Sequence, residues 1–303
     1  MRSEKLKNSR LLTPHRVYVY DQKKISTQTL FLEKIIIFAV EIITQIYTMS
    51  IENGNKLNRL LQKNNRGGLY FSAWLKENGY SDQLVDRYRN SGWLSALSKG
   101  VMYRTGDKLR SFQVLESYNG QLNKNFHIAA HSALELFGFN HYVPMGKPVL
   151  MIGHPKEETV PDWMKNNDLD YSLKFFSTKT FSTTRLASFN SDYPHLQASV
   201  PEQAFLESLL LTPKQYSCMD MFYIMEQLTT LRPDVLQKLL ENTDNLKVKR
   251  MFLYMAEKAG HDWFQSLNTD RIELGTAKHK LVENGVYVPK YRITLPRELY
   301  EYE

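Results

Sequence analysis

Five basic side chains cluster around one short predicted helix and the hairpin that follows it. The stretch "SDQLVDRYRNSGWLSALSKGVMYRTGD" runs from Ser81 to Asp107, and it contains or directly precedes Arg87, Arg89, Lys99, Arg104 and Lys108. Ammonium and guanidinium groups bind phosphates, and Arg also pairs with guanine through two hydrogen bonds. These residue types favour recognition of a polyanion.

The charge of the chain is concentrated in the same region. Residues 56–110 hold eleven Lys or Arg and four Asp or Glu, a net charge of +7, which equals the net charge of the whole chain. Residues 1–55 have a net charge of +3 and residues 111–303 a net charge of −3. This distribution indicates a local polyanion-binding module rather than a generally basic protein.

Three short helices and a small hairpin are expected to position these bases. Leu57, Leu60 and Leu61 recur with helical spacing within residues 56–64. A second helix, "AWLKEN", is expected to be capped by Ser72 and to end at Gly79. A third is capped by Ser81 and ends before Gly92, and the alternating "VMYRT" follows as a strand. This order is typical of a winged helix-turn-helix.

The third helix has an apolar stripe formed by Leu84, Val85 and Tyr88, so its other face is expected to point toward DNA. Arg can pair with guanine, Gln or Asn with adenine, and Asp86 either accepts from cytosine or holds Arg87 in place. The hairpin would carry its basic residues to the DNA backbone or into the minor groove, and further bases would follow at the base of the hairpin. The predicted DNA-binding residues are Gln83, Asp86, Arg87, Asn90, Lys99, Arg104, Lys108 and Arg110.

The domain organisation follows from the change of charge and pattern near residue 110. The fold class expected is α+β, mainly helical, with a winged helix-turn-helix at residues 49–110 and a larger mixed α/β domain at residues 111–303. Residues 1–48 form an extension of uncertain role, and Met49, the residue that follows it, is an alternative start. Its apolar run is interrupted by charges, which favours an amphipathic helix or a poorly ordered extension over a membrane span.

A single cysteine, Cys218, lies in an apolar run, so we expect a buried structural thiol, no internal disulfide and a cytoplasmic protein. His127 and His131 are spaced i, i+4 on a predicted helix, but a packed pair is favoured over a metal site because no third ligand accompanies them. The basic cluster at residues 247–250 is expected on a solvated helix face, which is favoured over a second contact with DNA or RNA. Neither a cofactor nor a metal is predicted.

A resemblance to a known family strengthens the DNA-binding interpretation. "QLVDRYRNSGWL" and "KGVMYRTGD" resemble the N-terminal winged-helix domain of AbiEi antitoxins of type IV toxin–antitoxin systems. Later blocks resemble the family in the same order: "HSALELFGFNHYVP", "PEQAFLESLL", "LRPDVLQKLLE", "KVKRMFLYMAEKAGHDWF" and "RIELGTAKHKLVENGVYVPKYRITLP". The resemblance covers residues 54–299.

The resemblance implies an antitoxin that represses its own operon by binding inverted repeats in promoter DNA. It also implies a nucleotidyltransferase-type toxin as functional counterpart, without a stable complex, and an antitoxin domain at residues 111–303 with no catalytic residues. Two alternatives stay open: a winged helix that docks another protein, and a transcriptional regulator without a toxin partner.

Overall fold

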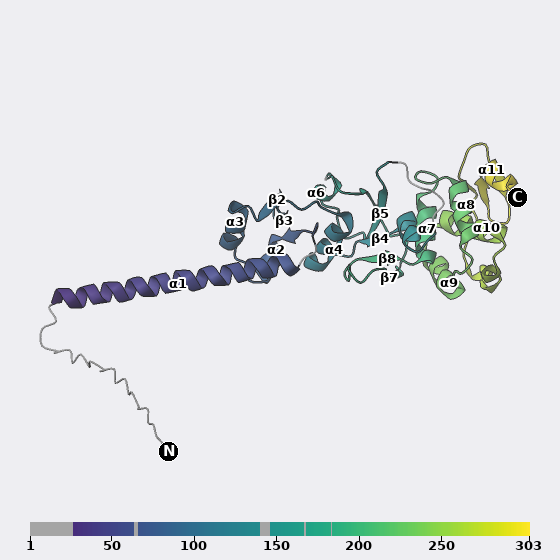
Figure 1. The fold of residues 1–303 in the computed structure, drawn as a ribbon. Helices are drawn as coiled ribbons and strands as arrows, with labels where there is room; N and C mark the ends of the chain where they lie inside the picture. The colour runs from purple at the N-terminus through teal and green to yellow at the C-terminus, as the bar shows by residue number, and fades with distance from the viewer. Residues whose placement is uncertain (1–26, 64–65, 140–145, 167, 183) are drawn as a thin grey trace, which may run out of the picture. The chain divides into compact units, whose positions relative to one another are not determined.

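The computed structural model describes residues 27–63, 66–139, 146–166, 168–182 and 184–303 (Figure 1). The described chain is mixed α/β and contains three β-sheets. It divides into two units, residues 1–58 and residues 59–303.

The first unit contains most of helix α1 (Thr27–Lys63). The expected helix in the apolar run is therefore present in the described residues. Large apolar side chains along it are exposed, including Leu32, Phe38 and Ile43, the last two at 64% and 65%. Even so, among the described residues no helix combines the length and the apolar character needed to cross a membrane.

The second unit begins with the elements that carry the predicted DNA-binding residues. In chain order they are β1 (Tyr70–Phe71), α2 (Ser72–Glu77), α3 (Asp82–Asn90), β2 (Leu94–Ser98) and β3 (Val101–Arg104). The strands form an antiparallel sheet in the order β1-β3-β2, in which β2 and β3 form the hairpin and β1 pairs with the other side of β3. Gly100 makes the tight turn between β2 and β3 with a φ of 74°, a conformation that favours glycine.

Ser72 has a different role from the one expected. Helix α2 begins at Ser72 itself, and Phe71 occupies the N-cap position without a side-chain cap. The Ser72 backbone N–H donates to the Gly100 carbonyl at 2.9 Å, and its hydroxyl lies where a Cβ on Gly100 would collide with it. Ser72 therefore joins α2 to the hairpin turn.

Helix α4 (Ser111–Leu122) packs directly on β1. Ser117 Oγ accepts from the Leu69 N–H at 3.0 Å. Gln121 accepts from the Phe71 N–H at 3.0 Å and donates to the Leu69 carbonyl at 2.7 Å. These side chains satisfy backbone groups on the outer edge of β1, which would otherwise be an unpaired sheet edge.

A five-stranded mixed sheet follows, in the order β6-β5-β4-β8-β7. Its strands are β4 (His127–Ile128), β5 (Val149–His154), β6 (Ser172–Ser177), β7 (Leu186–Ala187) and β8 (Gln197–Ser199). Helices α5 (Ala130–Leu136) and α6 (Asp162–Lys165) lie between them in sequence. The expected helix over residues 126–139 is therefore wrong at its start, because His127 and Ile128 form the central strand.

The C-terminal part is mainly helical, and its long helices lie within or close to the segments that the sequence pattern predicts as helices, residues 202–211, 216–230, 233–242 and 246–259. Its long helices are α7 (Pro201–Leu211), α8 (Cys218–Gln227), α9 (Pro233–Asn242) and α10 (Leu246–Ala259). Two 3-10 turns, Asp262–Ser266 and Thr269–Arg271, precede a small sheet of β9 (His279–Lys280), β10 (Val286–Val288) and β11 (Ile293–Leu295), and α11 (Arg297–Glu301) follows.

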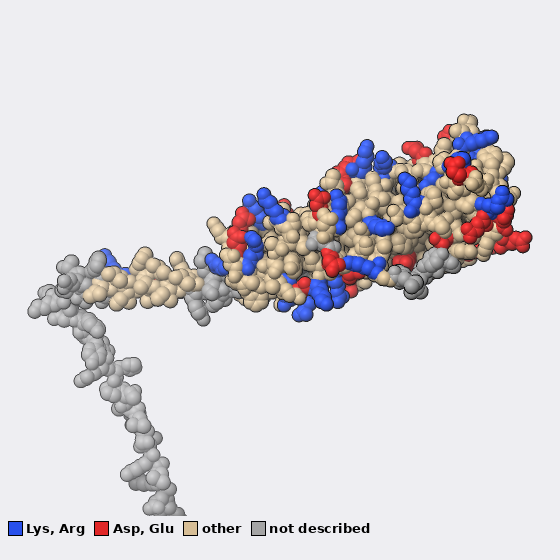
Figure 2. All heavy atoms as spheres, turned by 90° about the horizontal axis from the view of Figure 1, so that it is seen from above, with Lys and Arg blue, Asp and Glu red and all other residues tan. Residues whose placement is uncertain are grey.

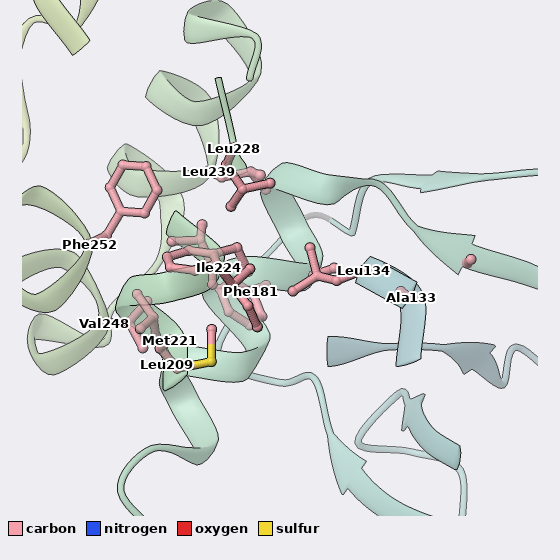
Figure 3. Packing of buried hydrophobic residues seen from close by; sticks show 14 of the residues in the cluster. Ala133, Leu134, Phe181, Leu209, Met221, Ile224, Leu228, Leu239, Val248 and Phe252 are labelled. Atoms are coloured by element: carbon pink, nitrogen blue, oxygen red, sulfur yellow. The ribbon is translucent and has the colours of Figure 1, made fainter. Parts of the chain in front are cut away.

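The helices of this part bury a continuous apolar core, shown in Figure 3 around Leu209, Met221 and Phe252. Cys218 belongs to it and is 4% exposed, which confirms the expected buried thiol. Burial raises the pKa of Cys218 to about 11, so the reactive thiolate is scarce at neutral pH.

Candidate nucleic-acid interface

Helix α3 is fixed by a local cap and an apolar stripe, as the sequence predicts. Ser81 Oγ accepts from the Leu84 N–H at 3.3 Å. Leu84, Val85 and Tyr88 are buried, and Gly92 turns the chain after the helix with a φ of 75°. One face of α3 is thus held against the unit, and the opposite face is available to a ligand.

The opposite face of α3 carries polar groups with one internal ion pair. The predicted contact residues Gln83, Asp86, Arg87 and Asn90 are all exposed. Asp86 Oδ1 accepts from Arg89 Nη1 at 3.2 Å. The alternative in which Asp86 holds Arg87 is therefore wrong. Among the described residues, no hydrogen bond or ion pair occupies the Arg87 guanidinium, so it can bind another molecule.

The hairpin residues occupy two different environments. Lys99 is exposed at the turn between β2 and β3. Arg104 is half-buried at the far end of β3, opposite the buried Leu94. Its charge acts on Tyr70, whose pKa is raised to about 12, chiefly by burial and less by Asp107, while Arg104 opposes the increase. The exposed Lys99 side chain therefore has more freedom to contact a ligand than the half-buried Arg104 side chain.

Lys108 and Arg110 are exposed beyond the open end of the hairpin, whereas Lys99 lies at its turn. The backbone around them is fixed: the Arg110 N–H donates to the Gly67 carbonyl at 3.1 Å, and Asp107 Oδ2 accepts from the Gly67 N–H at 3.2 Å. The predicted residues thus form an exposed helix face, a turn and a third basic site at the hairpin base.

Two further residues of this region, Arg89 and Trp93, have environments that the sequence did not predict. Arg89 was noted only as part of the basic cluster, although its spacing of i+3 from Asp86 is a signal for an ion pair on a helix. Trp93, the residue before β2, is a large apolar side chain that is 48% exposed. The backbone N–H of Trp93 donates to the Tyr88 carbonyl, and the Trp93 carbonyl accepts from the Thr105 N–H. These hydrogen bonds fix the position of Trp93 between α3 and the hairpin.

Asp168 and Asp170, which follow α6, are both exposed. Asp168 pairs with Lys147 at 2.6 Å. Asp170 has a further role, because its Oδ1 accepts from the backbone N–H and the hydroxyl of Ser111 at 2.7 and 2.6 Å. A carboxylate from a distant loop thereby binds the first turn of α4.

The two predicted helical histidines lie in different elements. His127 is in β4 and buried, with Nε2 3.6 Å from Glu207 Oε1. His131 is in α5, where Nδ1 lies 2.5 Å from the Tyr216 hydroxyl, and burial together with Lys174 lowers its pKa to about 4. In the part of the chain that the structure describes, no group of three or more His, Cys, Asp or Glu could hold a metal ion.

The buried Glu207 carboxylate organises the surroundings of His127. It accepts from the Ala130 N–H at 2.9 Å, from Ser199 Oγ at 3.0 Å and from Gln203 Nε2 at 3.0 Å. Three donors compensate much of the cost of burying a charge. This network joins α7 to the central sheet and to the start of α5.

The cluster at residues 247–250 does not form a solvated face, which corrects the expectation. Arg250 is 1% exposed and donates from Nε to the Leu274 carbonyl at 3.0 Å and from Nη1 to the Arg292 carbonyl at 2.9 Å. Lys247 Nζ donates to the carbonyls of Leu210 and Thr212 at 2.8 and 2.6 Å. These cations bind backbone carbonyls inside the protein, so they are not available to nucleic acid.

Figure 2 shows basic and acidic side chains interspersed over one face of the described molecule. The excess of basic residues in residues 56–110, a net charge of +7 against −3 for residues 111–303, is a property of the sequence.

Comparisons with known proteins identify the family. Residues 53–145 match the model of the N-terminal domain of the AbiEi transcriptional regulator and antitoxin, and residues 147–296 match the model described as "Transcriptional regulator, AbiEi antitoxin, Type IV TA system". No curated protein matches the chain.

Among solved structures, the chain is similar to the crystal structure of the RV2827C protein from Mycobacterium tuberculosis. The identity is 17%, the TM-score is 0.52, and the match covers 74% of this chain and 85% of that one. At this identity the likeness concerns the fold alone. The two family models together span most of the chain, and it therefore belongs to the AbiEi family of transcriptional-regulator antitoxins of type IV toxin–antitoxin systems.

Proposed function

We propose that residues 49–110 form a winged helix-turn-helix that binds duplex DNA from the protein's own promoter and represses its operon. The observation that carries this proposal is helix α3, which is held by Ser81 and a buried stripe, while the Arg87 guanidinium on its exposed polar face has no partner among the described residues. The sheet order β1-β3-β2 and the net charge of +7 over residues 56–110 support it.

In this proposal α3 lies in the major groove and contacts base edges. Arg87 is the residue suited to guanine, and Gln83 and Asn90 are suited to adenine. Asp86 can accept from cytosine while its ion pair with Arg89 reduces its repulsion of the nearby phosphates. The exposed, polar side of one helix thus supplies donors and acceptors for several successive base pairs.

The remaining basic residues are assigned to the DNA backbone. Lys99 at the exposed hairpin turn, together with Lys108 and Arg110 at the hairpin base, would neutralise phosphates and fix the register of α3. Arg104 is half-buried beside Tyr70 and has less freedom to reach a phosphate. We therefore expect Arg104 to contribute partly through the stability of the sheet.

We further propose that residues 111–303 counter a nucleotidyltransferase-type toxin without forming a stable complex with it. Family membership supports this assignment, and the net charge of −3 makes this part a poor binder of DNA by itself. Because Ser117 and Gln121 of α4 hold the edge of β1, the two functions are best separated by point substitutions in the full chain, and not by truncation.

The test combines two readouts in cells that carry a cognate toxin gene and a promoter–reporter fusion. The full chain with Arg87→Ala, Lys99→Ala and Lys108→Ala should rescue growth at the wild-type protein level while the reporter is derepressed. A matched triple variant with Lys156→Ala, Lys179→Ala and Lys214→Ala removes the same charge elsewhere and should repress normally. Growth rescue lost in proportion to repression, at equal protein levels, would contradict separate functions.

A further inference from the structure

A basic pocket lies at the edge of the five-stranded sheet, far along the chain from the proposed DNA-binding residues. It has a volume of about 270 Å³ and is formed by the edge strand β7 with Arg185 before it, and by the start of α9, which are neighbours in Figure 1. Its lining contains three cations, one carboxylate and three aliphatic side chains: Arg185, Arg232, Lys238, Asp234, Leu186, Val200 and Val235.

Arg232 is held in place by a buried acid. Its Nε and Nη2 donate to the two carboxylate oxygens of Glu202 at 2.9 Å each, and its backbone N–H donates to Glu202 at 2.9 Å. Burial of Glu202 opposes its ionisation, but the hydrogen bonds from Arg232 outweigh that effect and lower the pKa of Glu202. The pair is therefore ionised at neutral pH.

This arrangement uses only two of the guanidinium's five N–H groups. Among the described residues, Nη1 of Arg232 has no acceptor, and the Arg232 side chain is 55% exposed. A guanidinium fixed on one edge and open on the other is pre-organised to bind an oxyanion, because little side-chain entropy remains to be lost.

The other two cations of the pocket are unneutralised. Arg185 and Lys238 are exposed, and neither forms an ion pair with any residue in the described ranges. With Arg232 balanced by Glu202, these two charges face the single carboxylate of Asp234. The pocket therefore has a net positive charge and three cationic groups around one small hollow.

We propose that this pocket binds the phosphate group of a small phosphorylated molecule of about the size of a mononucleotide. The volume lies just below the range of about 300–1,000 Å³ typical of pockets for drug-sized ligands, which favours a small ligand. A phosphate oxygen pair matches the open edge of Arg232, while Arg185 and Lys238 supply further charge-assisted hydrogen bonds. The aliphatic floor suits the organic part of the ligand.

The test is isothermal titration calorimetry of the full-length protein with inorganic phosphate, adenosine monophosphate, adenosine and a short single-stranded oligonucleotide, all at constant ionic strength. Phosphate and the monophosphate should bind and compete with each other, and adenosine should not bind. Binding of the oligonucleotide alone would overturn the proposal in favour of a nucleic-acid surface, and so would the absence of binding by phosphate and by the monophosphate.

Variants assign the binding to the pocket. Arg185→Gln and Lys238→Gln should each weaken binding about tenfold or more, the loss expected for a hydrogen bond to a charged group. Asp234→Asn should strengthen binding, because it removes the only acid of the lining. Lys179→Gln, an exposed lysine outside the lining, should leave the affinity unchanged. Equal affinity in wild type, Arg185→Gln and Lys238→Gln would refute the assignment.

Discussion

Truncation of Arg87 to alanine tests whether the exposed face of α3 distinguishes base pairs. The Arg87 side chain is exposed and makes no hydrogen bond or ion pair with the described residues, so its removal should leave the fold intact. A bidentate contact to guanine contributes about 1–3 kcal/mol of discrimination. Arg87→Ala should therefore weaken binding to promoter DNA by a factor of about 5 to 150, with a much smaller loss on scrambled duplex.

Lys99→Ala provides the contrast, because Lys99 lies at the hairpin turn and is assigned to a phosphate. Its loss should weaken binding to promoter and scrambled duplex to a similar degree. The slope of log K against log salt should fall in magnitude by about 0.9, the value for one phosphate contact on B-DNA. Lys156→Ala, a change of the same charge in the loop after β5, should have neither effect.

Fluorescence anisotropy of labelled promoter and scrambled duplexes at several salt concentrations measures both quantities. Circular dichroism of each variant checks that the fold is unchanged. If Arg87→Ala and Lys99→Ala produce the same loss on both duplexes, Arg87 is only a phosphate contact. The proposed orientation of α3 in the major groove would then have no support from this residue.

Three further predictions concern stability, each measured by urea denaturation. Ser81→Ala should lower the free energy of unfolding by about 1 kcal/mol through loss of the α3 cap, whereas Ser81→Asp should retain most of it. Arg250→Met should lower the free energy of unfolding by about 2–6 kcal/mol, because the Leu274 and Arg292 carbonyls each lose a hydrogen bond, at about 1–3 kcal/mol each. A decrease of less than about 1 kcal/mol would contradict this role of Arg250. Burial lowers the folded-state pKa of His131 to about 4, below its unfolded value. The contribution of His131 to the free energy of unfolding is therefore complete above about pH 6.5 and is lost as the pH falls toward 4. The pKa shift corresponds to at most about 3 kcal/mol of the free energy of unfolding. His131→Gln should therefore make this free energy depend less on pH below about 6.5. An unchanged dependence on pH would refute the role given to His131.

The sequence predicted those features of the fold that are determined by residues close to one another in the chain. The Ser81 cap and the stripe of Leu84, Val85 and Tyr88 both follow from spacing within one turn or two. Each is a short-range preference that the surrounding fold reinforces. The exposed face of α3 could be named in advance for the same reason, although its contact with DNA stays a prediction.

Features that depend on distant partners could not be predicted in this way. His127 and Ile128 have helical neighbours in sequence, but they form a strand because β5 and β8 flank them on both sides. Arg250 can be buried because carbonyls 24 and 42 residues further along the chain accept hydrogen bonds from its guanidinium. Arg104 is half-buried at the end of β3, where it lies opposite the buried Leu94 of β2 and its charge acts on Tyr70. Periodicity contains no information about these contacts.

The most direct test of the central claim is a binding titration of the full-length protein on its own upstream DNA, with scrambled duplex as competitor. We expect preferential binding to the upstream region, with an affinity that decreases steeply as salt rises, because several basic residues around α3 and the hairpin neutralise phosphates. Equal affinity for upstream and scrambled duplex would contradict specific recognition by α3. Affinity that does not depend on salt would contradict the proposed role of the basic residues 56–110.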